Sequence, residues 1–371
     1  MKSPIYDWHL STSAKMADFG GWEMPIEYPK GVGKFPGGTL AEHLAVRERV
    51  GIFDVSHLGK VSVKGAGAKE FVNSYVTNDL NRISTGKGQY NLFCNEDGGV
   101  IDDLIIYEYS GDDIFIIPNA ANCAKVAADL QEFAPPEIVV QNIHQDYGVF
   151  AVQGALSGDV LKALGLDLNL DYMSFTTVAL PKYPQLGELI IARTGYSGEF
   201  GYELLPKWSS ALEIWKILTP IIAELDGRVC GLGARDTLRT EMGYPLHGHE
   251  LSLAISPIQA SANWAVVLTK EKFRGKAALE LERAAGPERI MRALKSNDRG
   301  IPRPEMKVLN QNGEEIGEVT SGTFSPTLKV GIALALLKPE YKVGDLVQID
   351  VRGRLSSATI VKAPFVPSKV N

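Results

Sequence analysis

The segment GGVIDDLIIYEY at residues 98–109 places two adjacent aspartates in a run that is otherwise apolar and β-branched. Such side chains suit a pleated and packed strand. Because successive strand residues point to opposite faces, Asp102 and Asp103 face opposite sides, and each side carries apolar neighbours. A buried carboxylate is costly unless it is paired or hydrogen-bonded. The segment therefore predicts a strand that is buried on both faces and whose two acids have different roles.

The length and composition of the chain limit the classes of protein to which it can belong. Its 371 residues are more than one hydrophobic core usually organises, which predicts two or three domains. The net charge of -6 disfavours a nucleic-acid or anionic-membrane partner. Cys94, Cys123 and Cys230 have no CxxC spacing, which is typical of reduced cysteines and argues against a zinc site. Since the sequence has neither an apolar signal core nor a run of ~20 apolar residues, we expect a cytoplasmic protein without a membrane partner.

Helical and strand patterns alternate irregularly along the first part of the chain, which favours an α+β fold over a doubly wound sheet. Helices are expected at residues 39–51, 67–79, 121–133 and 209–225. We expect Gly51 to cap the first of these helices and Pro220 to break or bend the last. Strands are expected at residues 59–64, 100–109, 113–118, 148–153 and 188–193.

The character of the sequence changes after about residue 283. Short strand candidates follow, separated by turn signals such as Asn312 and Gly313 and the stretch VRGRLSS at 351–357. These patterns predict a small antiparallel barrel or sandwich. We therefore expect two regions, residues 1–283 and residues 284–371.

The segment VCGLGARDTLRTEMG at residues 229–243 predicts a glycine-rich loop that enters a helix. It fails the dinucleotide-binding fingerprint, because Asp236 stands at the third glycine position. Arg235 and Arg239 lie one turn apart and share a helix face. Two neighbouring guanidinium groups require an anion, which is either a ligand carboxylate or the pair of Asp236 and Glu241.

The segment RTGYSGEFGYE at residues 193–203 predicts a tightly turned loop, because it has three glycines. One interpretation is a hairpin with a packed tyrosine. The other is a pocket wall on which Glu203 binds an amidine-like ligand edge through two parallel hydrogen bonds.

Other chemistry-bearing residues have weaker patterns. The i,i+2 spacing of His247 and His249 is poor evidence for a metal site, and we expect none. His57 is expected to be a hydrogen-bonded structural histidine. No GxSxG elbow or activated cysteine indicates a covalent nucleophile. The remaining candidate residues suit a site for a flat, polar-edged ligand with an anionic tail. In this site one carboxylate of the protein would lie at the reacting end of the ligand.

Taken together, the motifs identify a family resemblance. In order along the chain they are DFGGWEMPIEY, EHLAVRERVGIFDVSHLG, TNDL, GGVIDDLIIY, NAAN, AVQG, RTGYSGEFGYEL, GLGARDTLRTEMG and TSGTFSPTL. Their joint order resembles the T-protein family of the glycine cleavage system, the aminomethyltransferases, from about residue 5 to the final PFVP.

The resemblance implies an α+β fold with three lobes around a central tetrahydrofolate site. Residues 1–283 would form the catalytic, tetrahydrofolate-binding region as two interwoven lobes, and residues 284–371 would form a C-terminal antiparallel β-barrel. The implied reaction splits the aminomethyl group on the dihydrolipoyl arm of a lipoylated H-protein into ammonia and a methylene group carried by tetrahydrofolate. Tetrahydrofolate is the co-substrate, and no metal is implied.

The resemblance also implies roles for individual residues. Asp103 matches the catalytic aspartate, Glu203 the pterin-binding glutamate and Arg235 a folate-binding arginine. The remaining positions expected near the ligand are Asn119, Tyr90, Tyr172, Tyr196 and Leu58, the last of which stands where many relatives have Met. A carboxylate at Asp103 would orient the reacting amine and stabilise its positive charge. We assign Asp102, on the other face, to structure, with hydrogen bonds to loop backbone.

Three alternatives remain open at this point. Another tetrahydrofolate-dependent enzyme, such as a demethylase of N-methyl or sulfonium substrates, would keep the folate pocket and change the substrate side. A non-catalytic folate-binding factor for iron–sulfur maturation would carry a cysteine motif near FRGKAAL at 273–279, which has no cysteine. A structural or interaction protein would not explain acids in an apolar strand.

Overall fold

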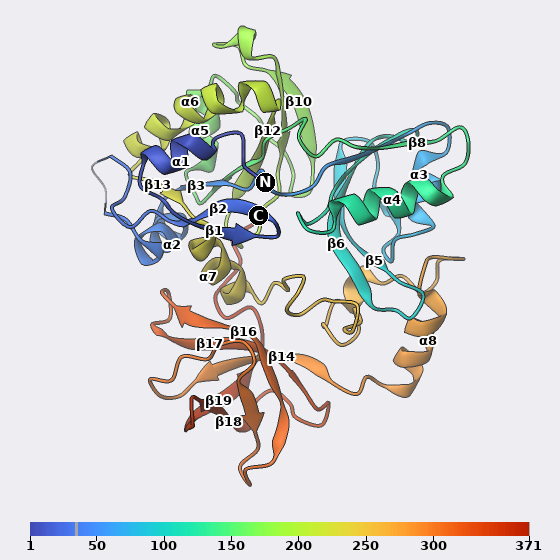
Figure 1. Ribbon diagram of the computed structural model, residues 1–371, viewed down its shortest axis with the longest axis vertical. Helices are drawn as coiled ribbons and strands as arrows, with labels where there is room; N and C mark the ends of the chain where they lie inside the picture. Colours follow the sequence, from blue (N-terminus) through green and yellow to red (C-terminus); the bar gives the residue numbers. More distant parts are fainter. Residues whose placement is uncertain (34–35, 371) are drawn as a thin grey trace.

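The computed structural model describes residues 1–33 and 36–370. They form three β-rich lobes around a common centre, near which the N- and C-terminal ends lie (Figure 1). The helices are α1 (Tyr6–Ser11), α2 (Thr39–Glu48), α3 (Ala68–Asn73), α4 (Cys123–Phe133), α5 (Ser157–Ala163), α6 (Ala211–Glu224), α7 (Leu232–Met242) and α8 (Lys276–Ala285). The strands are β1 (Lys15–Phe19), β2 (Trp22–Glu27), β3 (Gly51–Asp54), β4 (Val61–Lys64), β5 (Lys87–Cys94), β6 (Val100–Ser110), β7 (Asp113–Ile117), β8 (Val139–Asn142), β9 (Phe150–Gln153), β10 (Phe175–Ala179), β11 (Glu188–Ala192), β12 (Gly201–Pro206), β13 (Arg228–Cys230), β14 (Ile290–Ser296), β15 (Lys307–Leu309), β16 (Glu315–Ser325), β17 (Val330–Leu337), β18 (Leu346–Val351) and β19 (Arg354–Val361).

The first lobe is a six-stranded sheet in the order β10-β11-β12-β9-β3-β13. Its pairs are antiparallel except for β3 with β13. Helices α1, α5 and α6 lie along one side of this sheet (Figure 1). Helix α6 packs there because Ile214, Leu218 and Ile222 recur at helical spacing and are all buried. Trp215 of the same helix contacts Phe150 of β9, with ring centroids 4.9 Å apart, so the sheet and helix share one apolar core.

The second lobe is a five-stranded sheet in the order β5-β6-β7-β4-β8. Helices α3 and α4 pack beside it (Figure 1), and α4 buries Val126, Ala127 and Leu130 against it. Strand β6 lies between β5 and β7, which gives it a partner on each edge. The chain enters this lobe after β3 and returns to the first lobe at β9, so the two sheets are interwoven in sequence.

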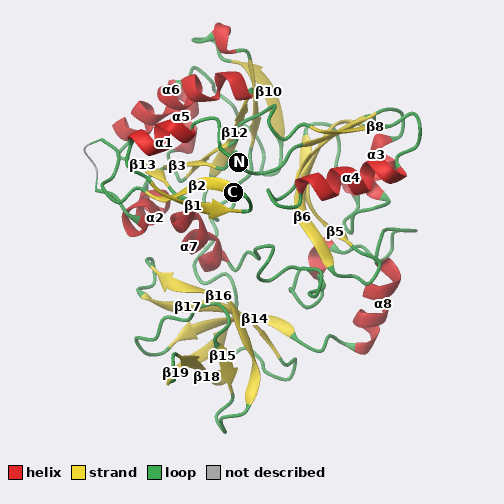
Figure 2. Ribbon diagram, viewed as in Figure 1, coloured by secondary structure: helices red, strands yellow, loops and turns green. Residues whose placement is uncertain are grey.

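The third lobe is a closed barrel in the order β14-β17-β16-β15-β18-β19. Between Ile290 and Val361 the elements described are all strands (Figure 2). The predicted hairpins are confirmed. Gly313 lies between β15 and β16 at φ 83°, and Arg352 and Gly353 join β18 to β19 at φ 57° and 84°. The α+β class with a C-terminal antiparallel barrel is therefore confirmed, whereas the division at residues 283 and 284 stays a prediction.

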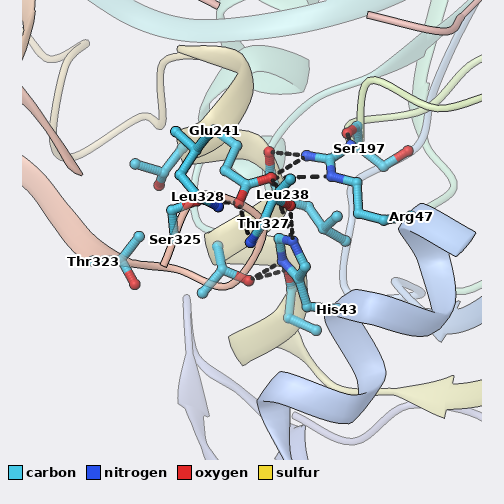
Figure 3. A network of polar contacts seen from close by, with 12 residues as sticks. His43, Arg47, Ser197, Leu238, Glu241, Thr323, Ser325, Thr327 and Leu328 are labelled. Atoms are coloured by element: carbon cyan, nitrogen blue, oxygen red, sulfur yellow. Dashed lines mark hydrogen bonds and ion pairs between the residues drawn. The ribbon is translucent and has the colours of Figure 1, made fainter. Parts of the chain in front are cut away.

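A buried polar network joins the first lobe to the barrel through α2 and α7 (Figure 3). Its centre is Glu241 of α7, whose Oε2 accepts hydrogen bonds from Arg47 Nε at 3.0 Å and Nη2 at 2.8 Å. The Oε1 atom accepts a hydrogen bond from Ser325 Oγ and one from Thr327 N at 3.2 Å, both on the barrel. Removal of one partner from such a buried pair would leave an uncompensated charge. The network therefore fixes α7 between the two lobes.

The C-terminal segment, residues 362–370, returns from the barrel to the other side of α7. Phe365 N donates to Glu241 O at 2.8 Å, and Lys369 N donates to Gly198 O at 2.7 Å. Gly198 has φ +77°, and a Cβ atom added to it would lie 2.2 Å from Met242 Sδ of α7. The tail, α7 and the glycine-rich loop at 193–203 thus form one packed unit.

Three local predictions were wrong. Gly51 begins β3 instead of capping α2, which ends at Glu48, because a parallel pairing with Arg228 places it in the sheet. The helix expected at 67–79 ends at Asn73. Helix α6 continues through Pro220 without the expected break, because its buried apolar stripe outweighs the one hydrogen bond that proline removes, and the expected bend stays a prediction.

Candidate active site

A cavity of about 210 Å³ lies where the first two lobes, α7 and the connector after α7 meet. Strands β5 and β6 supply one wall, the glycine-rich loop and β12 another, and α7 with residues 244–247 a third. All eight residues predicted for the site line this cavity: Leu58, Tyr90, Asp103, Asn119, Tyr172, Tyr196, Glu203 and Arg235. The structure therefore brings the whole predicted set together from segments that are spread between residues 58 and 235.

Asp102 and Asp103 occupy opposite faces of β6, as the alternation of strand side chains predicts. Asp102 is fully buried, and its Oδ2 accepts a hydrogen bond from the backbone N of Asn119 at 2.9 Å. Its Oδ1 accepts from the Nδ2 atoms of Asn119 and Asn122, each at 2.8 Å. The expected hydrogen bond of Asp102 to loop backbone is confirmed, and its assignment to structure stays a prediction.

Asp103 faces the cavity. On its side of β6, Ile101 and Tyr107 are buried as expected, whereas Asp103 and Ile105 are only partly buried. The Oδ2 atom of Asp103 accepts a hydrogen bond from Tyr90 Oη at 3.1 Å, and its Oδ1 accepts one from Asn119 Nδ2 at 2.8 Å. Two donors on different segments therefore orient the carboxylate. Burial raises the pKa of Asp103, although the neighbouring His247 opposes this. Burial and the charge of Asp103 raise the pKa of Asp102 to about 7.

Glu203 of β12 places a second carboxylate in the cavity. Its Oε2 accepts a hydrogen bond from Thr194 Oγ1, which also lies 3.1 Å from Tyr107 Oη. Within residues 1–33 and 36–370, Oε1 of Glu203 has no hydrogen-bond donor. Burial raises the pKa of Glu203. One oxygen is thus held by the protein and the other is open to a ligand.

The two arginines of α7 have different surroundings. Arg239 forms ion pairs with Asp236 at 2.7 Å and with Glu250 at 3.1 Å. The guanidinium of Arg235 lies 4.4 Å from the ring centroid of Tyr196 and has no ion pair with the described residues. The structure thus confirms Asp236 as a protein anion for this pair, and it corrects Glu241, which pairs with Arg47 instead. Arg235 alone keeps its charge available to the cavity.

Aromatic rings form much of the cavity wall. Tyr196 stacks on Tyr244 with centroids 5.7 Å apart, and its hydroxyl donates to Pro245 O. Tyr90 stacks on Trp264 with centroids 5.1 Å apart. Tyr172 is partly exposed at the margin. Flat apolar walls with a few polar groups are typical of small-molecule sites.

The histidines near the site have different environments. His247 Nδ1 lies 3.1 Å from Asn122 Nδ2, and its Nε2 lies 3.2 Å from Val100 O, so both ring nitrogens have a hydrogen-bond partner. His57 contradicts our expectation, because neither ring nitrogen has a hydrogen-bond partner in the described structure. Its ring packs edge-on against Phe19 at 5.2 Å. Burial, followed by the charge of Arg235, lowers the pKa of His57 to about 3.

The predicted site set leaves out several residues that line the cavity, among them Tyr107, Thr194, Tyr244 and Trp264. Thr194 directly precedes Gly195 of the glycine-rich loop, so its position could have indicated a ligand contact. Tyr244 and Trp264 lie in a connector without a periodic pattern, so nothing in the local sequence indicated that they contact a ligand site. Among the residues that the structure describes, no cluster of three or more His, Cys, Asp or Glu side chains could hold a metal ion.

Comparisons with known proteins cover nearly the whole chain. The GCVT N-terminal domain matches residues 5–270, and the glycine cleavage T-protein C-terminal barrel domain matches residues 289–367. An aminomethyltransferase of Parafrankia sp. (strain EAN1pec) is 54% identical over 98% of this chain and 97% of its own. An aminomethyltransferase of Mycobacterium tuberculosis (strain ATCC 25618 / H37Rv) is 51% identical over 99% of this chain and 97% of its own.

A solved structure gives the same result for the fold. The glycine cleavage system aminomethyltransferase T from Bartonella henselae has a TM-score of 0.89 and 30% sequence identity, and the match covers 100% of this chain and 99% of that one. No helix in residues 1–33 or 36–370 is long and apolar enough to cross a membrane. From the two domain matches and the full-length relatives, we conclude that the chain belongs to the glycine cleavage T-protein family.

Proposed function

We propose that this protein is the aminomethyltransferase of a glycine cleavage system. In this reaction the methylene carbon of an aminomethyl group, carried on the dihydrolipoyl arm of a lipoylated H-protein, passes to tetrahydrofolate. Ammonia leaves, and the arm regains its thiol. Family membership and the similarity to aminomethyltransferases over nearly the full chain support this reaction class. The H-protein, tetrahydrofolate and a cytoplasmic location are part of the proposal.

The two polar anchors of the cavity fit a reduced folate. The open Oε1 of Glu203, beside the held Oε2, suits the two parallel N–H donors of an aminopyrimidinone edge. Arg235 offers an unpaired guanidinium to the carboxylate end of such a ligand. The stacked rings of Tyr196 and Tyr244 offer an apolar surface to its aromatic middle. Bound tetrahydrofolate would supply the amine nucleophile that accepts the carbon.

The observation that carries the proposal is the orientation of Asp103. Its carboxylate is held by Tyr90 and Asn119 in the same cavity as Glu203 and Arg235. A preorganised negative charge there orients the amino group of the substrate and stabilises positive charge as its C–N bond breaks. Low local polarity strengthens this interaction. Burial raises the pKa of Asp103, which favours a second role for this carboxyl as a proton carrier in the reaction.

The deciding experiment measures ammonia release from aminomethylated H-protein with and without tetrahydrofolate. We expect folate-dependent release by the natural protein. Asp103→Asn should lower the rate at least about 100-fold, as expected when a charge-stabilising group is lost, with folate affinity unchanged. Asp113→Asn, a partly exposed aspartate on the neighbouring strand β7, is the control and should retain full activity. No ammonia release, together with demethylation of an N-methyl or sulfonium compound, would refute the proposal.

A further inference from the structure

Trp264 is the most exposed large aromatic side chain among the described residues, and it nevertheless lines the cavity. Its side chain is 66% exposed. One face of the indole covers Tyr90, with the two rings inclined by 27°. An exposed aromatic ring at the mouth of a site differs from an isolated surface residue, because it offers a ready apolar surface to a ligand.

The segment around Trp264 is fixed to the second lobe. Trp264 lies in the 3₁₀ turn Asn263–Ala265. Thr77 Oγ1 donates to Ala265 O at 2.7 Å, and Val267 N donates to Thr77 O at 2.9 Å. Ala265 itself is fully buried. The backbone that carries the indole is therefore fixed before any ligand arrives, which reduces the entropic cost of binding.

Trp264 is connected to the reacting end of the cavity through Tyr90. It stacks on Tyr90, and the Tyr90 hydroxyl donates to Asp103 at 3.1 Å. Glu203 and Arg235 belong instead to β12 and α7. A saturated chain lying along the two rings would end at the carboxylate, and its sulfur would contact an aromatic edge.

We propose that Trp264 and Tyr90 form the binding surface for the carrier arm, the saturated dihydrolipoyl chain that brings the aminomethyl carbon to Asp103. This inference rests on the function proposed above. It assigns Trp264 a role in specificity: the indole recognises the arm through its methylene groups and sulfur, and it contributes nothing to folate binding. The arm approaches along the β5 side of the cavity, whereas folate occupies the side of β12 and α7.

The test compares Trp264→Ala and Trp264→Phe with Phe133→Ala. Phe133 is a matched control, because it is 54% exposed and stacks on Tyr75 with centroids 6.1 Å apart, but it lies on α4 and does not line the cavity. Steady-state assays give KM for aminomethylated H-protein, and calorimetry gives Kd for tetrahydrofolate. Circular dichroism verifies that each variant is folded.

We expect Trp264→Ala to raise KM for aminomethylated H-protein about tenfold or more, with folate Kd changed less than twofold. Trp264→Phe should recover most of the loss, and Phe133→Ala should match the natural protein. An unchanged KM in Trp264→Ala would overturn the inference, as would a weakened folate Kd in that variant. If the natural protein itself releases no ammonia from aminomethylated H-protein, the proposed function fails first, and the two failures are thereby distinguished.

Discussion

Replacement of Glu203 by alanine should weaken tetrahydrofolate binding by about 2 kcal/mol, or roughly 30-fold in Kd. The magnitude follows from the structure, because one carboxylate oxygen is held by Thr194 and the other is open to the ligand. A hydrogen bond to a charged group contributes about 1.5–3 kcal/mol, and each 1.4 kcal/mol is about tenfold in affinity. Burial already raises the pKa of this carboxyl, so ionised Glu203 is poorly solvated without a ligand and gains from pairing with N–H donors.

Glutamine at position 203 should not rescue binding. Its amide can still accept the hydrogen bond from Thr194, but its NH₂ group would then meet the N–H donors of the ligand. We therefore expect Glu203→Gln to bind at least as weakly as Glu203→Ala.

Isothermal calorimetry with tetrahydrofolate measures these affinities. Glu188→Ala is the control, since Glu188 lies on the neighbouring strand β11 with its side chain exposed, and its Kd should be unchanged. Equal affinities for the natural protein and Glu203→Ala would refute the reasoning about the open oxygen.

Two further predictions concern the C-terminal segment and the buried histidine. Lys369→Pro removes the N–H that donates to Gly198 O and should raise the Kd for folate about threefold to tenfold in calorimetry. Lys369→Ala keeps that N–H and should bind folate normally. Equal Kd values in the two variants would contradict the role of the tail. Because the pKa of His57 falls from about 6.5 to about 3 on folding, the unfolded chain binds more protons between these values, and stability is lost as pH falls through that window. Between pH 6.5 and pH 4, the free energy of unfolding measured in urea should therefore fall by about 3 kcal/mol less in His57→Phe than in the natural protein. An equal fall in the two proteins would refute this.

Much of the fold could be predicted because its causes are local. The positive φ values at Arg352 and Gly353 belong to a two-residue turn that the flanking strand pattern already indicates. The split of Asp102 and Asp103 between two faces follows from strand geometry alone. Helix α4 begins within two residues of its expected start because its composition favours a helix and no strand competes for it.

Eight residues that line the cavity could be predicted, but their contacts could not. Tyr90 and Asn119 were expected near the ligand. Their hydrogen bonds to Asp103 could not be predicted, because the three residues lie on different segments of the second lobe. Thr194, Tyr244 and Trp264 were missed, because neither periodicity nor turn chemistry marks a residue that a folded connector brings to a cavity.

The amino-acid sequence by itself determined the strand that carries the two acids and the hairpins of the barrel, because periodicity and turn chemistry act over a few residues. The set of candidate site residues came from the family resemblance of the motifs and not from local pattern. Only the tertiary structure decided which arginine stays unpaired, which histidine is desolvated and where Gly51 lies. Arg239 pairs with Glu250 and Glu241 pairs with Arg47, whereas neither ring nitrogen of His57 has a hydrogen-bond partner in the described structure. The pairing of Arg47 with Glu241 spans 194 positions, so no local pattern contains it. Which charged side chains form ion pairs depends on how the lobes pack, and Arg235, which has no ion pair with the described residues, faces the candidate site.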